Sequence, residues 1–223
     1  MSITPSGGAG EILGTGTLVN QANGQIFAAG GTGILYLAVA NVLNSGKIEA
    51  TNNNELYLES PTVTNSANGV IVSGVNSTVV LFTDDVIGGT LDTTQTGIFD
   101  AVDTELDGSG GHPVTLNGTL DVYDNVGLVV VGVLNNIGSI SLGSTGDLTF
   151  IALEGSEVTL EGHGNIILSG FSENSIATSS SLTKLGQLTH LNNDGNTISG
   201  AGSINNLILN NAKGSLIDAT GAC

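Results

Sequence analysis

The sequence predicts an all-β fold, a right-handed parallel β-helix (a β-solenoid) of about ten rungs. Three observations predict it. A short phrase of Asn, Gly and a following aliphatic residue recurs roughly every twenty residues, apolar positions alternate over short runs, and the spacing between repeats varies. Each unit of such a repeat completes its hydrophobic core only by stacking on its neighbours, so one elongated domain over residues 1–223 is expected.

The repeated phrase is clearest near the end of the chain. Residues 191–198 read Leu-Asn-Asn-Asp-Gly-Asn-Thr-Ile, and residues 209–216 give the next copy. Weaker copies occupy 19–26 and 43–50. Asn and Gly tolerate the positive φ that sharp bends require, so the phrase is predicted to form the corners between strands. Stacked Asn side chains at such corners would form hydrogen-bonded ladders along the solenoid.

Period-two alternation predicts the strands between these corners, because alternate side chains of a strand point to opposite faces. Tyr36 and Tyr57 are separated by about one rung, so they are expected to be neighbours on one face. Three segments show the alternation: Leu56 and Leu58 with Tyr57 and Glu59, Val79 and Leu81 with Val80 and Phe82, and Leu148 and Phe150 with Thr149 and Ile151.

The lengths of the rungs can be followed by the glycine that precedes each aliphatic residue. Most intervals between these glycines lie from 17 to 29 residues, and one interval of 40 is interpreted as two turns. This spread favours a right-handed β-helix with corner loops of free length over a strict hexapeptide solenoid. The marker residues are Gly24, Gly46, Gly69, Gly89, Gly118, Gly138, Gly155, Gly195 and Gly214.

Composition supports a folded chain built from thin aliphatic layers. Gly is frequent at 34 residues, but Pro is only 3, which excludes collagen and a Pro-rich linker. A hydrophobic fraction of 39% argues against disorder, and Trp is absent.

The charge balance excludes two classes of partner. With 3 basic and 20 acidic residues, the formal net charge of -17 repels nucleic acid and anionic membrane surfaces. No apolar run approaches the length that crosses a bilayer as a helix, so membrane insertion is not expected. The one cysteine, Cys223, cannot form an internal disulfide, which is compatible with export.

Several segments resemble the degenerate repeats of large bacterial exoproteins, the filamentous-haemagglutinin-like and autotransporter passenger β-helices. They are residues 198–204, 207–211 and 214–219, with the weaker copies at 19–26 and 43–50. The resemblance implies a secreted or cell-surface protein. It carries over no functional residue.

The leading hypothesis is therefore a structural or adhesive segment, a stiff stalk that presents loops to a host-cell, cell-wall or extracellular glycan surface. The last residues read like a rung cut short, so the chain is expected to be a fragment of a longer repetitive protein. Because the end rungs of a solenoid carry unpaired strand edges, end-to-end self-association is also expected.

The interval between Gly89 and Gly118 contains the densest group of acidic residues. Asp103, Glu105 and Asp107 occupy alternate positions before a glycine, as at the start of a calcium loop. The later bidentate Glu of an EF-hand loop is absent, because Val114 stands there. The two interpretations are a Ca²⁺ site, with no other cofactor required, and a solvated acidic loop projecting from the rod.

A catalytic alternative rests on Asp84, Asp85 and His163. Pectin-lyase-like β-helix polygalacturonases resemble this chain in having an Asp-Asp pair and a Gly-His-Gly motif, and carboxylates serve glycoside hydrolysis as acid and base. The two motifs lie several rungs apart here, and the chain has no Arg for the basic motif of those enzymes. Binding or cleavage of an extracellular polysaccharide is the second hypothesis, and no catalytic residue is assigned.

Overall fold

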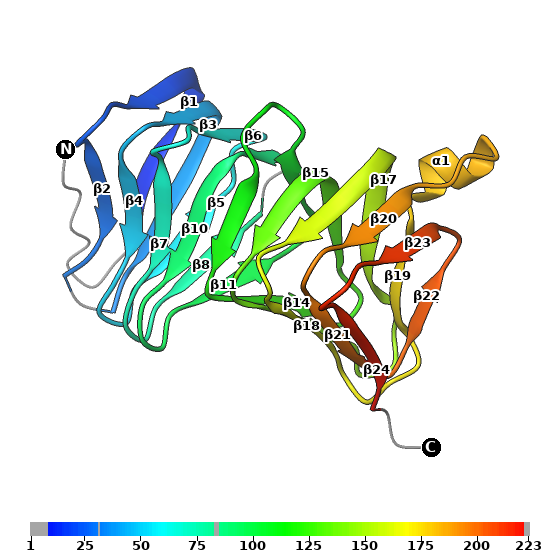
Figure 1. Cartoon of the computed structure of the whole chain (residues 1–223). Helices are drawn as coiled ribbons and strands as arrows, with labels where there is room; N and C mark the ends of the chain where they lie inside the picture. The colour runs from blue at the N-terminus through cyan, green and yellow to red at the C-terminus, as the bar shows by residue number, and fades with distance from the viewer. Residues whose placement is uncertain (1–8, 31, 83–84, 221–223) are drawn as a thin grey trace.

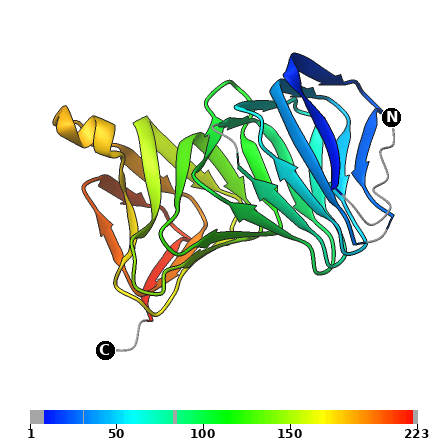
Figure 2. The ribbon, with the colours of Figure 1, turned by 180° about the vertical axis from the view of Figure 1, so that it is seen from behind.

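The computed structural model describes residues 9–30, 32–82 and 85–220, and these form a parallel β-solenoid. The strands run across a rod, each turn stacked on the one before. The first and last described strands, β1 (Ala9–Asn20) and β24 (Leu216–Ala219), lie at opposite ends of the rod (Figure 1). Figure 2 shows the same stacking from behind. The predicted all-β solenoid class is confirmed.

Each turn contributes strands to three faces, here called A, B and C. Face A contains the first halves of β1 and β3 (Ile34–Asn44), then β5 (Glu55–Leu58), β8 (Thr78–Leu81), β11 (Ile98–Ala101), β14 (Thr119–Tyr123), β16 (Ser139–Gly143), β18 (Asn165–Leu168), β21 (Thr197–Gly200) and β24.

Face B contains the second halves of β1 and β3, then β6 (Thr62–Asn65), β9 (Asp85–Ile87), β12 (Thr104–Gly108), the first halves of β15 (Gly127–Asn136) and β17 (Thr149–Glu161), β19 (Asn174–Thr178) and β22 (Ser203–Asn205). Face C contains β2 (Gln25–Ala28), β4 (Lys47–Ala50), β7 (Val70–Ser73), β10 (Gly89–Thr93), β13 (Val114–Asn117), the second halves of β15 and β17, β20 (His190–Asn193) and β23 (Ile208–Asn211).

The described strands therefore make about nine turns, with β24 beginning a tenth on face A. This is close to the ten rungs predicted. The right-handed sense of winding stays a prediction.

Aliphatic side chains stacked in columns form the core. On face A, one inward column is fully buried from Leu35 to Leu120, with Phe99 as its largest member. Inward positions of the interior turns are covered by the turn before and the turn after, so each added turn completes the burial of its neighbour. The column reads Leu35, Leu56, Val79, Phe99, Leu120, Ile140 and Ile166.

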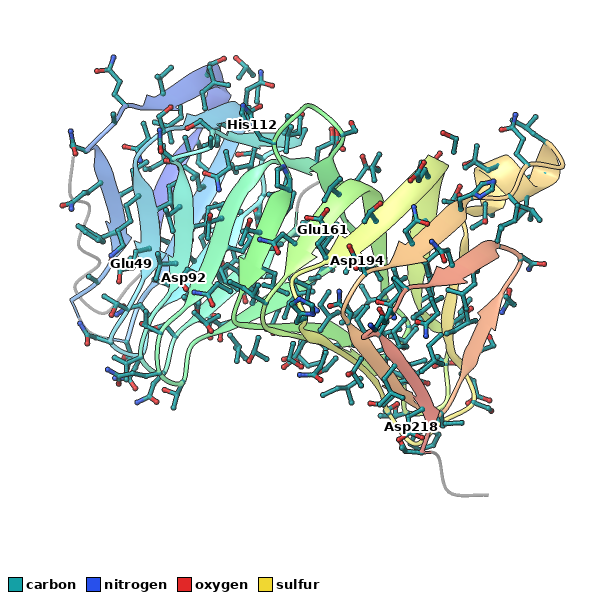
Figure 3. The ribbon with its side chains drawn as sticks, viewed as in Figure 1. Glu49, Asp92, His112, Glu161, Asp194 and Asp218 are labelled. Atoms are coloured by element: carbon teal, nitrogen blue, oxygen red, sulfur yellow. The ribbon has the colours of Figure 1, made fainter. Side chains whose placement is uncertain are left out.

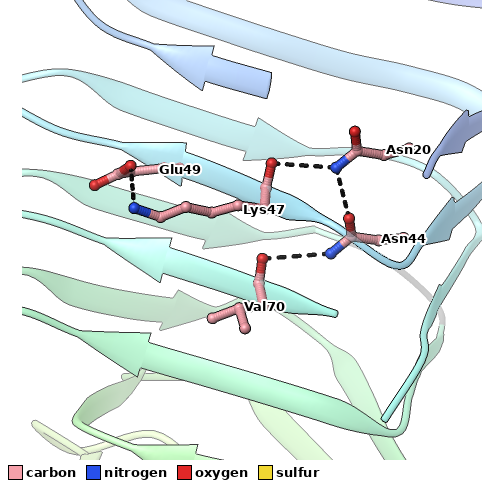
Figure 4. A network of polar contacts seen from close by, with 5 residues as sticks. All are labelled: Asn20, Asn44, Lys47, Glu49 and Val70. Carbon is pink, nitrogen blue, oxygen red and sulfur yellow. Dashed lines mark hydrogen bonds and ion pairs between the residues drawn. The ribbon is translucent and has the colours of Figure 1, made fainter. Parts of the chain in front are cut away.

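Buried asparagines form a ladder at the corner between faces B and C. Nδ2 of Asn20 donates to Oδ1 of Asn44 at 2.8 Å, and Nδ2 of Asn44 donates to Oδ1 of Asn65 at 2.7 Å. The same amides also donate to the carbonyl oxygens of Lys47 and Val70 on face C (Figure 4). The predicted ladder is confirmed. So is the corner chemistry, since Asn23 and Asn125 adopt positive φ.

Two interpretations of rung length were wrong. Gly89 begins a face C strand whereas Gly118 precedes a face A strand, so their 29-residue interval spans more than one turn. Along face C, Leu91 pairs with Leu116, 25 positions later. The 40-residue interval is not two turns. Val158 pairs with Leu191, and this single turn is lengthened by the segment around helix α1 (Ser180–Lys184), between β19 and β20.

The predicted alternation holds at 56–59 and 79–82, where Leu56, Leu58, Val79 and Leu81 face inward. The side chains at 148–151 also alternate. Thr149 and Ile151 are buried, whereas Leu148 is 56% exposed and Phe150 lies on the outer surface. Both sets contain apolar residues, so hydrophobicity alone does not select the face.

Candidate functional site

Face B carries four carboxylates on its outer side. Glu105 of β12 pairs in register with Asp85 of β9, one turn earlier. Asp107, two positions after Glu105, is in register with Val131 and then with Glu154 of β17. Side chains at alternate positions of a strand point to the same face, so Glu105 and Asp107 project together. The stacking thus gathers acids that are up to 69 positions apart in the sequence.

The carboxyl group of Glu105 has a perturbed pKa. Burial raises the pKa of Glu105 from 4.5 to about 7, and the negative charges of Asp85, Asp107 and Glu154 act in the same direction. Among the described residues the ion pair present is Lys47–Glu49, on face C. A group with this pKa can donate or accept a proton near neutral pH, which is a property of many functional carboxylates.

A groove begins next to this cluster on the same face. Its floor continues the column of Asp85 and Glu105 through Val129, Ala152 and Ala177, which are paired in register. Because these side chains are small, they leave an open volume of about 480 Å³ on the outside of the solenoid. The floor is apolar.

The two walls of the groove differ in chemistry. Leu148 and Phe150 form an apolar wall, and the Phe150 ring lies over Gly127, where no side chain would fit. The opposite wall is polar. Oε1 of Glu154 accepts a hydrogen bond of 3.0 Å from the hydroxyl of Ser181, which belongs to α1. The helical insertion therefore supplies one side of the groove.

The residues predicted to bind calcium are only partly brought together. Glu105 and Asp107 share the outer side of β12, which is a strand and not a projecting loop. Asp103 lies at the preceding corner with a φ of 49°, and its Oδ1 accepts a hydrogen bond of 3.1 Å from the backbone N–H of Gly127. Across the described ranges, no three His, Cys, Asp or Glu side chains are grouped so that they could hold a metal ion. The calcium site stays a prediction, which thermal melting with and without Ca²⁺ tests.

Of the catalytic alternative, the structure places Asp85 and His163, which lie on different parts of the solenoid. Asp84 lies outside the described residues. Asp85 points outward from face B, whereas His163 occupies a corner between β17 and β18 with a φ of 63°. The His163 ring packs against Gly195 of the next turn. Asp85 and His163 are therefore separated both along the rod and around it, and they cannot act on one bond.

Face A carries a second group of aromatic and acidic side chains. The rings of Tyr36 and Tyr57 lie 5.1 Å apart between centroids, which confirms the predicted pair. The Tyr123 hydroxyl donates to Oδ1 of Asp100 at 3.0 Å. Burial raises the pKa values of Asp100 and Asp121, which are paired in register, and it raises the pKa of Tyr123 to about 12. None of these residues lines the face B groove.

Sequence reasoning did not find the groove. Ala152 and Glu154 lie in one turn and Ala177 and Ser181 in the next, and only the register brings them together. The one signal in the sequence is the 40-residue interval, because an insertion in a solenoid usually projects from one face.

Comparisons with family models, curated proteins and solved structures give no match to this chain. Among the described residues, no helix is long and apolar enough to cross a membrane.

Proposed function

We propose that this chain is a structural segment, a stiff β-solenoid stalk of a secreted or cell-surface bacterial protein that presents its corner segments to a partner. The observation that carries the proposal is the unbroken pairing of strands on three faces from β1 to β24. A fold does not by itself define a function, so the proposal rests on how the turns are joined.

Three parallel ladders make the rod resistant to bending. Any bend must stretch backbone hydrogen bonds on at least one face, and the buried Asn20–Asn44–Asn65 ladder adds side-chain bonds at a corner. Nine turns spaced by about 4.8 Å span roughly 40 Å. Such a rod keeps the segments at its two ends a fixed distance apart.

The segments available for presentation project from the corners. Residues 109–113 join β12 to β13 and include the exposed His112 (Figure 3), and the segment around α1 extends from the far end of the rod. Acidic side chains such as Glu49, Asp92 and Glu161 mark the outer surface of face C (Figure 3). A host-cell, cell-wall or glycan surface is the proposed partner.

The stalk proposal is tested by fusing a rigid globular domain to each end of the chain and measuring their separation by electron microscopy. A stalk gives one narrow distribution of separations. A matched fusion, in which a Gly-Ser linker of the same number of residues replaces the chain, should give a broad one. A distribution for the chain as broad as that of the linker would contradict the proposal.

A second candidate function is carbohydrate binding in the face B groove. The specific observation is its mixed chemistry: an apolar floor and Phe150 suit the apolar side of a sugar ring, while Glu154 and the hydroxyls near Ser181 suit its hydroxyl groups. Pairs of polar groups at the rim of an apolar pocket fix the orientation of a ligand.

Glycan-array binding with a groove-filling variant tests this candidate. Ala152→Phe should abolish binding by occupying the floor. The matched control is Asn41→Phe, at an exposed position of the same outward column several turns away, which should bind like the parent chain. If no glycan binds the parent chain, the carbohydrate candidate fails and the stalk proposal is unaffected.

A further inference from the structure

The face B groove is continuous with the outward carboxylates of the same face. Its floor, made by Val129, Ala152 and Ala177, covers three successive turns, or about 10 Å at a strand spacing of about 4.8 Å. Glu105 is in register with Val129 one turn earlier, and Asp107 shares its side of β12. Floor and carboxylates therefore make one surface about 15 Å long, parallel to the axis of the solenoid, which suits an elongated ligand.

Three carboxylates of this surface form no ion pair in the described part of the chain. They are Glu105, Asp107 and Glu154, and the ion pair present is Lys47–Glu49 on face C. None of the three lysines lies on a strand of face B, since they belong to β4, to the end of α1 and to the turn between β23 and β24. Burial, and then the negative charges of its neighbours, raise the pKa of Glu105 to about 7. A positive charge next to this carboxylate is therefore favoured.

The groove beside these carboxylates selects the kind of cation. A metal ion gains nothing from an apolar floor, and within the described ranges no three His, Cys, Asp or Glu side chains are grouped to hold one. A ligand that covers the floor needs an apolar face, because Leu148 and Phe150 bound the groove on one side. It also needs polar groups for the opposite wall, which Glu154, Ser180 and Ser181 line. A sugar ring has both, and an amino group on that ring supplies the positive charge.

We propose that the face B groove binds a glycan that carries protonated amino groups, such as a chain of glucosamine units. Its sugar rings lie on the floor at Ala152, and one amino group donates to the carboxylates of Glu105 and Asp107. Hydrogen bonds between charged partners are stronger than those between neutral ones. The proposal rests on carbohydrate binding in this groove and adds the ligand class.

Isothermal titration calorimetry near neutral pH tests the ligand class with three linear tetrasaccharides of the same linkage, built from glucosamine, N-acetylglucosamine or glucose. The glucosamine tetramer should bind the parent chain about tenfold more tightly than the other two, because only its amino groups carry a charge. Equal affinities for all three would overturn the charged ligand class and leave carbohydrate binding standing. No binding of any of them overturns the proposal, whereas the glycan array decides on other carbohydrates.

Variants locate the amino group. Glu105→Gln with Asp107→Asn keeps the shape of both side chains and removes their charges, so the glucosamine tetramer should lose its advantage of about tenfold. The matched control is Glu161→Gln with Asp194→Asn, which changes the net charge equally at two exposed carboxylates of adjacent turns, on face C and at the corner after it (Figure 3). The control should keep the advantage. A preference that survives in the face B variant, or that is lost in the control, overturns the assignment.

Circular dichroism checks that each variant folds. If the face B double variant does not fold, Ala152→Phe and Asn41→Phe take its place, because only the first fills the floor of the groove. Ala152→Phe should abolish binding of the glucosamine tetramer, and Asn41→Phe should leave it unchanged. Binding that Ala152→Phe retains, or that Asn41→Phe loses, overturns the proposal.

Discussion

Nδ2 of Asn44 lies 2.7 Å from Oδ1 of Asn65, one turn further along the solenoid, and both side chains are almost completely buried. Asn44 also accepts from Asn20 and donates to the carbonyl oxygen of Val70. A single amide thus joins three consecutive turns. Its removal takes away the donor to the buried Oδ1 of Asn65 and the acceptor of the Gly46 backbone N–H, whereas Nδ2 of Asn20 keeps two carbonyl acceptors.

We expect Asn44→Ala to lower the free energy of unfolding by about 2–4 kcal/mol, because each unsatisfied buried partner costs on the order of 1–3 kcal/mol. The matched control is Asn210→Ala. Asn210 also donates to an asparagine of the adjacent turn, Asn192, but this pair is exposed. The control should cost less than about 0.5 kcal/mol. Urea denaturation measures the free energy of unfolding of both variants. Equal losses would show that the buried ladder bonds stabilise the fold no more than the exposed ones.

Neighbouring corners approach each other closely at Gly138, which predicts that an added side chain there destabilises the fold. A Cβ at position 138 would overlap the backbone of Gly118 in the preceding turn, so Gly138→Ala must separate two turns. We expect a loss of about 2 kcal/mol or more, as for other overpacking substitutions. Gly110→Ala is the control, because that position has open space around it. Thermal melting should show a lower Tm for Gly138→Ala alone.

The Tyr36–Tyr57 contact predicts a measurable coupling. Aromatic pairs at this separation contribute about 0.5–1.5 kcal/mol beyond their buried area. A double-mutant cycle with Tyr36→Ala and Tyr57→Ala should therefore give a coupling energy in that range. A coupling near zero would mean that the rings are only neighbours on face A and do not stabilise each other.

The raised pKa of Glu105 predicts how the stability of the folded chain depends on pH. Its pKa is raised in the folded state to about 7 from 4.5, so the folded chain binds this proton more tightly than the unfolded chain does. The corresponding stability is complete below pH 4.5 and is lost as the pH rises through 7. The glutamine side chain of the Glu105→Gln variant cannot ionise, so the variant does not show this loss of stability at high pH. Solvent screens a partly exposed group, so the effect is modest. The free energy of unfolding of the variant relative to that of the parent chain should be about 1 kcal/mol higher at pH 8 than at pH 5.

Urea melts of the parent chain and Glu105→Gln at pH 5 and pH 8 measure this difference. Glu173→Gln is a suitable control, since Glu173 lies in the turn before β19, outside the cluster. If the parent chain and Glu105→Gln lose the same stability between pH 5 and pH 8, the raised pKa of Glu105 is contradicted.

Local chemistry explains which features could be predicted from sequence. Positive φ at Asn23 and Asn125 and the Asn20–Asn44 bond follow from what Asn does at a sharp bend, so corners and ladder could be foreseen. Orientation at 148–151 could not, because Leu148 and Ile151 are equally apolar and tertiary packing decides between them.

The face B groove depends on register, which local patterns do not give. Glu105 and Asp85 become neighbours only because β9 and β12 occupy the same face in consecutive turns. The marker glycines do not all occupy the same corner of the solenoid. Gly89 begins a face C strand and Gly118 precedes a face A strand, so the interval between them does not measure one turn. Residues on either side of such a change could be assigned to a turn, but not to a face.

The chain is a stack of equivalent turns, and the removal of one whole turn is a stringent test of this architecture. Thr78 pairs with Ile98, so deletion of residues 78–97 removes one turn and restores the register. Spin labels at positions 9 and 165, seven turns apart on face A, report its length in a Cys223→Ser background.

We predict that the shortened chain unfolds cooperatively and that the distance between the labels falls by about 4.8 Å, one strand spacing. Deletion of residues 88–97 removes about half a turn and should prevent folding. A whole-turn deletion that fails to fold, or that folds with an unchanged distance between the labels, would contradict the stacked-turn architecture.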